Sequence, residues 1–198
     1  MGVTAKDIKS AAFKFFSRHG YEGASLSQIA HEAGIKKQSI YTHFDGKDDL
    51  FMQVVHDVAE LELDMKTKLL KDFQDEAFEQ QLFRYVSEHK RLVEEDERFF
   101  FWLRISFFPP VHLYDAVEEI FMRNEEQIER LIHQLFAKAI KAKRIGSQNP
   151  ETPTLAFMAL LDALAIELVY GADKERIKKK TAAGWAVFWR GITAGEDT

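Results

Sequence analysis

The chain has 198 residues, 46% of them hydrophobic and 30% charged, so it is long enough to bury a core and has an ordinary globular composition. Its net charge of −5 argues against a generic polyanion binder. The absence of cysteine excludes a disulfide framework, thiolate metal sites and a cysteine nucleophile, and it is typical of a reducing compartment.

The charge is unevenly distributed along the chain. Residues 1–47 carry a net charge of +3, which leaves −8 for the remaining residues. A basic N-terminal region on an acidic protein would favour binding of nucleic acid by that region. An excess of positive charge of this size also arises by chance. Residues 1–10 are polar, and we expect neither a secretory signal nor a membrane span, which predicts a cytoplasmic protein.

The N-terminal region begins with two predicted helices. The first spans residues 4–19, with Thr4 as its N-cap and Gly20 after its last turn, where a left-handed cap favours glycine. The second spans residues 26–33, with Ser25 as its N-cap.

A glycine turn and two more helices follow. Gly34 ends the second helix, and a short third helix is predicted over residues 37–44. Asp45 is the expected N-cap of a long helix that reaches about residue 72.

The rest of the chain also predicts helices, and no segment shows the alternation of a strand. Further helices are expected near residues 75–95, 97–107, 111–123, 125–143, 153–170 and 174–193. The predicted fold is therefore all-α, with about nine helices: a three-helix head over residues 1–47 and a larger helical body over residues 48–198.

Two short helices joined by a tight glycine turn, packed on a preceding helix, form a helix-turn-helix. In the third helix, we expect Ile40 and Phe44 to point inward. The outward-facing side chains, which can bond base edges or phosphates and include no carboxylate, are Gln38, Ser39, Thr42 and His43. Lys36 and Lys37 lie at the N-terminal end, where the helix dipole also favours phosphate.

The amino-acid sequence of this region identifies a protein family more specifically than its pattern of helices does. Residues 11–21 read AAFKFFSRHGY, residues 25–35 read SLSQIAHEAGI, residues 39–44 read SIYTHF and residues 47–50 read KDDL. Over about residues 4–55 the chain closely resembles the DNA-binding head of TetR-like bacterial transcriptional regulators. The alternative is a packed three-helix subdomain with no role at DNA.

The resemblance implies a set of residues that contact double-stranded DNA. Gln38 is the candidate for direct base reading, Thr42 for a thymine methyl group or a phosphate, and Lys47 for a backbone phosphate. The full predicted set is Ser25, Ser27, Lys36, Lys37, Gln38, Ser39, Tyr41, Thr42, His43 and Lys47. The chain departs from the family at Lys36, where a capping serine or threonine is frequent, and at Thr42, where a second aromatic is frequent; either change alters the expected operator.

The last two predicted helices carry apolar faces with small residues between large ones, which suit close helix packing. The resemblance implies a homodimer paired through these helices as a four-helix bundle. The predicted interface residues are Leu155, Ala159, Ala163, Ile166, Trp185, Phe188 and Trp189. The alternative is that these faces form core inside one subunit.

Residues 99–108, FFFWLRISFF, are apolar nearly all round, which predicts a buried helix. The resemblance implies an effector pocket in the body, and the predicted lining is Phe100, Phe101, Arg104, Phe108, His89, Tyr114 and Glu118. Arg104 would select an anionic head group and Glu118 a cation. The alternative is that the aromatic run is core and that Arg104 pairs with an acid such as Glu97.

These observations predict a homodimeric regulator, a repressor released from a palindromic operator when a small hydrophobic effector binds. No cofactor, metal or membrane partner is expected. One alternative is a DNA-binding adaptor that acts through a protein partner. An enzyme is the other alternative, although the seven histidines form no metal-binding spacing and no glycine-rich phosphate loop or Gly-x-Ser-x-Gly motif occurs.

Overall fold

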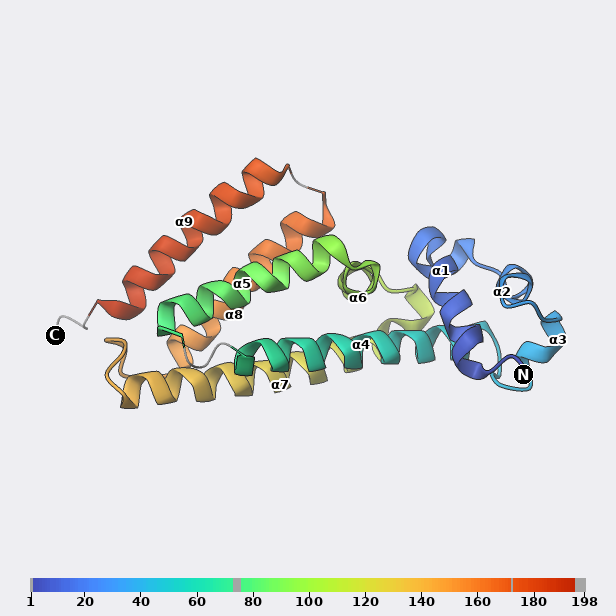
Figure 1. Cartoon of the computed structure of the whole chain (residues 1–198), viewed down its shortest axis with the longest axis horizontal. Coiled ribbons are helices and arrows are strands. Elements are labelled where there is room, and N and C mark those ends of the chain that lie inside the picture. The colour runs from blue at the N-terminus through green and yellow to red at the C-terminus, as the bar shows by residue number, and fades with distance from the viewer. Residues whose placement is uncertain (1, 73–75, 172, 195–198) are drawn as a thin grey trace. The chain divides into compact units, whose positions relative to one another are not determined.

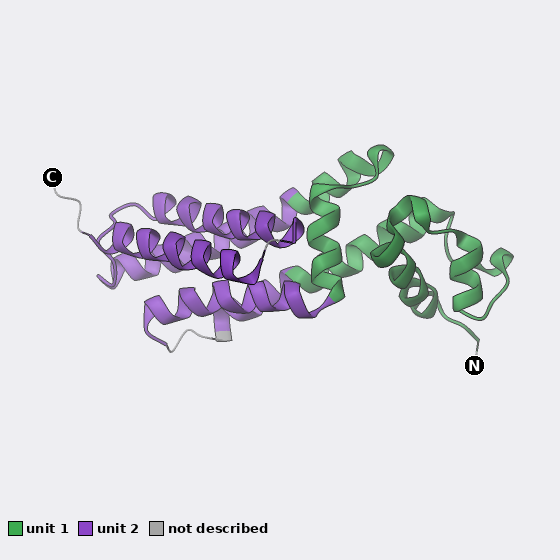
Figure 2. Ribbon diagram, turned by 90° about the horizontal axis from the view of Figure 1, so that it is seen from above, with its two compact units in different colours: residues 1–62, 97–121 green, residues 63–96, 122–198 purple. Residues whose placement is uncertain are grey.

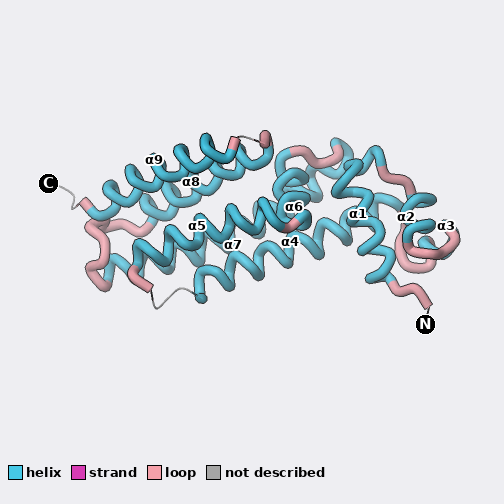
Figure 3. Tube along the Cα trace, turned by 45° about the horizontal axis from the view of Figure 1, so that its top comes forward, coloured by secondary structure: helices cyan, strands magenta, loops and turns pink. Residues whose placement is uncertain are grey.

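The computed structural model describes residues 2–72, 76–171 and 173–194, and every regular element in these ranges is helical (Figures 1 and 3). The elements are α1 (Ala5–Gly23), α2 (Leu26–Glu32), α3 (Lys37–Ile40), α4 (Lys47–Asp72), α5 (Phe78–Glu95), α6 (Glu97–Phe107), the 3₁₀ turn η1 (Val111–Leu113), α7 (Tyr114–Lys141), α8 (Glu151–Val169) and α9 (Lys174–Thr193). The all-α fold with a helix-turn-helix near the N-terminus is therefore confirmed.

The chain divides into two compact units (Figure 2). Unit 1 contains residues 1–62 and 97–121, and unit 2 contains residues 63–96 and 122–198. Unit 1 is thus larger than the predicted head, because α6 and the first part of α4 pack with α1–α3. The division of function at residue 47 stays a prediction.

The core of unit 1 is built on aromatic residues from helices far apart in the sequence. Phe16 of α1 is fully buried and meets Phe51 of α4 edge-on, with ring centroids 5.0 Å apart. Phe101 of α6 meets Phe13 in the same way at 5.5 Å. Each of these rings removes a large apolar area from water, so α1, α4 and α6 form one scaffold under the two short helices.

Two helix ends in unit 1 differ from the prediction. Gly20 breaks the helical path as expected, with φ 70°, but a further turn carries α1 to Gly23. The third helix ends at Ile40 rather than at Phe44, and the chain continues as a hydrogen-bonded turn. The Thr42 hydroxyl donates to the Ser39 carbonyl at 2.7 Å, and such side-chain bonds compete with helix continuation.

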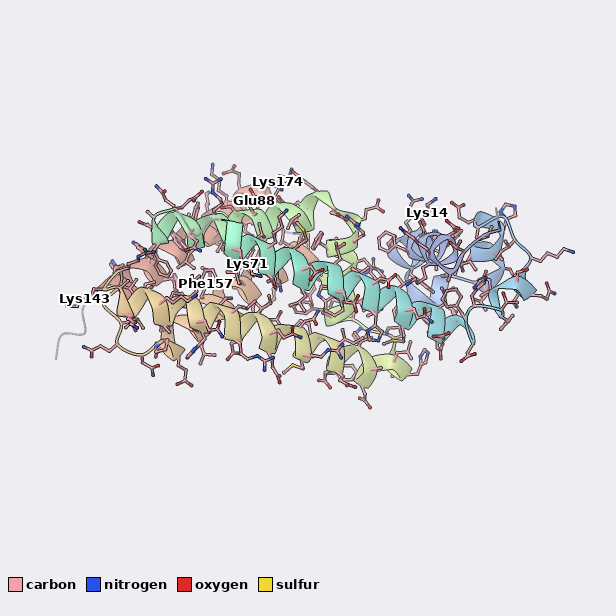
Figure 4. The ribbon with its side chains drawn as sticks, turned by 60° about the horizontal axis from the view of Figure 1, so that its bottom comes forward. Lys14, Lys71, Glu88, Lys143, Phe157 and Lys174 are labelled. Atoms are coloured by element: carbon pink, nitrogen blue, oxygen red, sulfur yellow. The ribbon has the colours of Figure 1, made fainter. Side chains whose placement is uncertain are left out.

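Unit 2 is held by a second aromatic cluster. Phe157 of α8, fully buried (Figure 4), lies 6.1 Å from the Phe136 ring of α7 and 5.6 Å from the Phe188 ring of α9. Phe78 of α5 meets Phe136 edge-on at 5.7 Å. Four helices therefore share this core.

The predicted break between residues 123 and 125 is wrong, since α7 is one helix from Tyr114 to Lys141. Buried residues recur at helical spacing through the region, at Ile120, Ile128 and Ile132, and Asn124 is itself buried. A continuous buried stripe keeps the helix intact where the local sequence alone suggested a stop.

One helix departs from the expectation that no segment suits a membrane. By length and composition alone α8 could cross one, with a mean hydropathy of 1.6 over its window, of which 44% is buried inside the subunit. It carries Asp162 and Glu167 and runs beside α9 (Figure 3). One side of α8 packs inside the subunit, where Phe157 and Leu161 are buried, and the other side, with Leu155 and Ile166, remains exposed.

A buried carboxylate connects α8 to α9. Glu167 is 8% exposed; its carboxylate accepts a hydrogen bond from Arg176 Nε at 2.8 Å and another from Lys180 Nζ. These two bonds lower the pKa of Glu167 to about 2 from its ordinary 4.5. The ionised form is thus the one that the folded protein selects.

We therefore predict that Glu167→Gln lowers the unfolding midpoint at neutral pH, because Arg176 and Lys180 lose their shared partner. A carboxylate whose pKa is depressed by folding contributes stability above its unfolded pKa and loses that contribution as the pH falls. The wild-type advantage over the variant should therefore shrink between about pH 4.5 and pH 2 in thermal unfolding scans. Glu129→Gln, on an exposed face of α7, is the control. A wild-type advantage that does not change over that range would contradict the prediction.

Candidate nucleic-acid interface and ligand pocket

Local hydrogen bonds build the turn between α2 and α3. Ser25 caps α2 as predicted: its hydroxyl accepts from the Gln28 N–H at 3.3 Å, and Gln28 Oε1 accepts from the Ser25 N–H at 3.1 Å. Gly34 has φ 71°, which allows the Ile35 N–H to return to the Ala30 carbonyl at 2.9 Å. The chain thereby reverses in few residues and starts α3 at a defined angle.

The segment over residues 36–44, here called the recognition segment, is anchored by two apolar side chains. Ile40 is fully buried and Phe44 is 2% exposed, both in the core of unit 1. Lys36 has no side-chain capping bond, as expected for a lysine at that position. Because the anchors are four residues apart, the side chains between and before them must face outward.

The structure places the predicted contact residues on that outer side. Tyr41 is 53% exposed, and Ser39 is half-buried. The remaining exposed members of the predicted set are Ser25, Ser27, Lys36, Lys37, Gln38, Thr42 and His43. The recognition segment contains no carboxylate, so nothing within it repels a phosphate.

Lys47 is held in place by a cluster that sequence reasoning missed. Its Nζ lies 4.0 Å from the centre of the Tyr21 ring, and the Tyr21 hydroxyl donates to Asp48. His112 Nε2 lies 3.5 Å from Asp48 Oδ2. Tyr21, Asp48 and His112 come from three separate elements, so no local pattern could reveal the cluster.

The same cluster sets the charge at the start of α4. The Tyr21 hydrogen bond lowers the pKa of Asp48, and burial together with that bond raises the pKa of Tyr21. Asp48 therefore stays ionised beside Lys47, while Tyr21 stays neutral. A positioned ammonium results, with its stem laid over an aromatic ring.

The predicted dimer residues fall into two groups. On α8, Leu155 and Ile166 are 49% and 45% exposed, and Ala159 and Ala163 lie exposed between them. They form an uncovered apolar stripe on the single subunit.

On α9 the aromatic residues of the predicted interface pack largely inside the subunit, and their role in a dimer stays a prediction. Trp185 is 8% exposed and packs inside the subunit, with ring centroids 5.1 Å from Phe83 and 5.8 Å from Phe188. Phe188 and Trp189 are half-buried in the same cluster. The outward-facing positions of α9 carry smaller residues, Ala182, Ala183, Ala186 and Val187.

The predicted effector residues have different surroundings in the structure. Phe101 is 2% exposed and belongs to the core of unit 1, where it packs on Phe13. Phe108 and Tyr114 are 55% and 49% exposed, and the Tyr114 hydroxyl donates to the exposed Glu118 at 3.1 Å. Phe101 is thus a core residue and the other three are exposed, and an effector role for Phe101, Phe108, Tyr114 and Glu118 stays a prediction.

The other three predicted residues belong to two different units. Phe100 is 37% exposed, so α6 is not buried on all sides, and a guanidinium nitrogen of Arg104 lies 3.6 Å from the Cβ position of Gly20. His89 belongs to unit 2, where burial, with a smaller contribution from Lys66, lowers its pKa to about 3 and keeps it neutral. The hydrophobicity of residues 99–108 predicted a buried helix, but it could not distinguish core residues from surface residues on a helix as short as α6.

A cleft of about 450 Å³ lies elsewhere in unit 2, between the last turn of α4, the first turns of α5 and the second half of α7. Its size falls within the range of small-molecule pockets. The lining residues are Thr67, Leu70, Lys71, Phe78, Gln81, Leu131, Gln134, Leu135, Lys138, Ala139, Ala142 and Arg144. None of them was singled out from the sequence, because they come from three helices whose packing is not visible in any one of them.

Comparison with known proteins gives concordant results. Residues 8–54 match the model of the family described as "Bacterial regulatory proteins, tetR family". Over 187 residues, 90% of each chain, the sequence is 28% identical to the uncharacterized HTH-type transcriptional regulator YhgD of Bacillus subtilis. It is 25% identical, over 75% of this chain and 76% of the relative, to IcaR, the negative transcriptional regulator of the biofilm operon icaADBC in Staphylococcus epidermidis.

The fold also matches solved structures along almost its full length. The transcriptional regulator FadR of Bacillus subtilis, solved in complex with stearoyl-CoA, aligns with a TM-score of 0.70 and 17% identity. The alignment covers 96% of this chain and 100% of that one. At this level of identity the likeness concerns the fold.

Proposed function

The chain belongs to the TetR family of DNA-binding transcriptional regulators, and on that premise we propose that it is a homodimeric repressor released from a palindromic operator by a small hydrophobic effector. This family consists of regulators and not of enzymes. The observation that carries the proposal is the recognition segment, whose acid-free outer side is held outward by the burial of Ile40 and Phe44.

Within the recognition segment, the chemistry of each exposed side chain suggests its role. Gln38 offers an amide that can pair with an adenine edge in the major groove. The Thr42 hydroxyl proton is engaged by the Ser39 carbonyl, which leaves its methyl group available for a thymine methyl. Lys47, positioned over Tyr21, suits a backbone phosphate.

The remaining proposed contacts position the head on the duplex. Ser25 and Ser27 lie at the N-terminus of α2, where backbone N–H groups and the helix dipole also attract phosphate. The other proposed phosphate contacts are Lys36, Lys37, Ser39, Tyr41 and His43. Residues 1–47 would thus read DNA, and residues 48–198 would pair the subunits and bind the effector.

The dimer is proposed to form through the exposed faces of α8 and α9. Leu155, Ile166 and Val187 remain solvent-exposed in the single chain, with small residues between them that permit close approach. A second copy packed on this face would complete a four-helix bundle by a two-fold axis. Two heads related by such an axis match a palindrome.

Repression and release follow from a shift between conformers. IcaR is named a negative regulator, and FadR was solved with an acyl thioester; these relatives support a repressor with a hydrophobic effector. The helix α4 begins at Lys47 and its last turns line the cleft of unit 2, so one continuous helix contributes residues to both proposed functions. An effector that binds more tightly to the conformer unsuited to the operator would release the DNA.

We predict that Gln38→Ala reduces discrimination among operator variants more than overall affinity. The loss should be about 1–3 kcal/mol and confined to one base-pair position of each half-site. The measurement is competition binding on an operator selected from random duplexes, with single-position variants. A uniform loss across all duplexes would contradict a base-reading role.

Lys47→Ala is the matched comparison for that experiment. Its loss of a phosphate contact should weaken all duplexes alike and reduce the salt slope by about one unit for each subunit. If the salt dependence of DNA binding is the same for Lys47→Ala as for the wild type, Lys47 does not contact a phosphate.

A second prediction concerns the dimer. Val187→Glu places a carboxylate in the proposed interface, once in each subunit, and should raise the dimer dissociation constant by about 100-fold or more. Sedimentation equilibrium measures the change. Val111→Glu is the control, because Val111 is 94% exposed and lies outside α8 and α9. A dimer that tolerates Val187→Glu as well as Val111→Glu would place the interface elsewhere.

A further inference from the structure

The cleft between α4, α5 and α7 has an apolar interior. Phe78 and Ala139 are 6% and 3% exposed and form its floor. Leu70, Leu131 and Leu135, all half-buried, contribute apolar walls. An aliphatic chain laid in this interior would remove apolar surface from water on both partners.

A buried amide closes one wall of the cleft. Gln81 is 3% exposed, and its Nε2 donates to the Leu70 carbonyl at 3.2 Å, which ties α5 to the last turns of α4. With this donor satisfied inside the protein, the wall remains compatible with a hydrocarbon. The cleft is therefore a formed feature of the packing rather than a gap between loose helices.

Among the described residues that line the cleft, all the charged ones are cations, and they form its rim. Lys71, in the last turn of α4 (Figure 4), and Lys138 and Arg144 are its charged residues, and all three are exposed. Among the described residues, no ion pair engages any of the three. Some other bases of unit 2 are paired, as Lys66 is with Glu125 at 3.2 Å.

This cluster of positive charge contrasts with the net negative charge of the rest of the body. Residues 48–198 carry a net charge of −8, so a lining whose described charged residues are three cations is a local exception, although Arg144 also borders a neighbouring cavity lined by Glu76 and Glu79. Converging positive charge at the mouth of an apolar cavity favours a ligand with a negative head and a hydrocarbon tail. A neutral hydrophobic ligand would make no charge contact with the rim, and a hydrophilic anion would leave the apolar floor in contact with water.

We propose that this cleft binds a long-chain amphiphilic anion, with the tail over Phe78 and Ala139 and the anionic head at Lys71, Lys138 and Arg144. The shared chemistry is an acyl chain with a carboxylate or a phosphate-bearing head. Binding at the cleft stands on its own, whereas its effect on the operator rests on the proposed function.

The full-length protein offers a built-in reporter for the test. Trp189 lies 6.2 Å from the ring of Phe78, a floor residue, so occupation of the cleft should change the tryptophan emission. The ligands are myristate, tetradecanol and myristoyl-CoA, each kept below the concentration at which it forms micelles. Saturable binding is expected for both anions, and the alcohol should bind at least about tenfold more weakly.

Variants separate the head group from the tail. Lys138→Gln and Arg144→Gln should each weaken myristate about threefold or more, because each removes one exposed charge contact, and neither should change tetradecanol binding. Lys141→Gln, on the same helix but outside the lining, is the matched control. Ala142→Phe changes an exposed lining residue without adding a tryptophan and should weaken all three ligands by filling the mouth.

Three results would overturn the inference: no saturable binding, equal binding of the alcohol and the anion, or rim variants that bind myristate as the wild type does. The myristate and myristoyl-CoA arms identify which head group the rim prefers. Because binding is measured without DNA, saturable myristate binding that leaves the operator complex intact would uphold the cleft and count against the proposed effector role alone.

Discussion

Burial of Ile40 and Phe44 is the interaction on which the rest of the structure depends. A helix of four residues has almost no stability of its own, because the free-energy cost of nucleating it exceeds the gain from the few hydrogen bonds it makes. Burying each apolar side chain contributes about 1.5–3 kcal/mol, and these two fix the segment onto the scaffold of α1, α4 and α6. Their position also decides which side chains remain outside, so core packing and surface chemistry are set by the same spacing.

The scaffold beneath that segment shows how distant parts of the chain serve one surface. Phe51 of α4 contacts Phe16 of α1 and Phe101 of α6, and the cluster at Tyr21 ties the start of α4 to the turn before α7. Lys47 is held by this cluster and not by its own helix. A single ammonium is thereby aimed with less loss of side-chain entropy on binding than a free lysine would suffer.

Much of the head could be predicted from the sequence because its signals are local. The capping box at Ser25, the left-handed glycine at position 34 and the inward spacing of Ile40 and Phe44 each depend on residues within one turn. The end of α3 was placed too late because the Thr42 hydroxyl bond to Ser39 competes with the helix. That competition has no signature in a hydrophobicity pattern.

The surroundings of residues in the body could not be predicted as well, because they depend on which helices pack against one another. Trp185 was expected at a subunit surface, yet it fills a space between α5 and α9 beside Phe83. Phe108 was expected in a pocket, yet the short α6 has more apolar residues than one buried face can hold. The cleft at Phe78 and Lys138 unites residues about sixty positions apart, which only the folded chain brings together.

The central claim is that two copies of the recognition segment read one palindrome. Native mass spectrometry of the protein with its selected operator, and with a duplex that carries a single half-site, tests it most directly. We expect two chains on the palindrome and binding at least about tenfold weaker to the half-site duplex. One chain on each duplex with equal affinity would contradict the account.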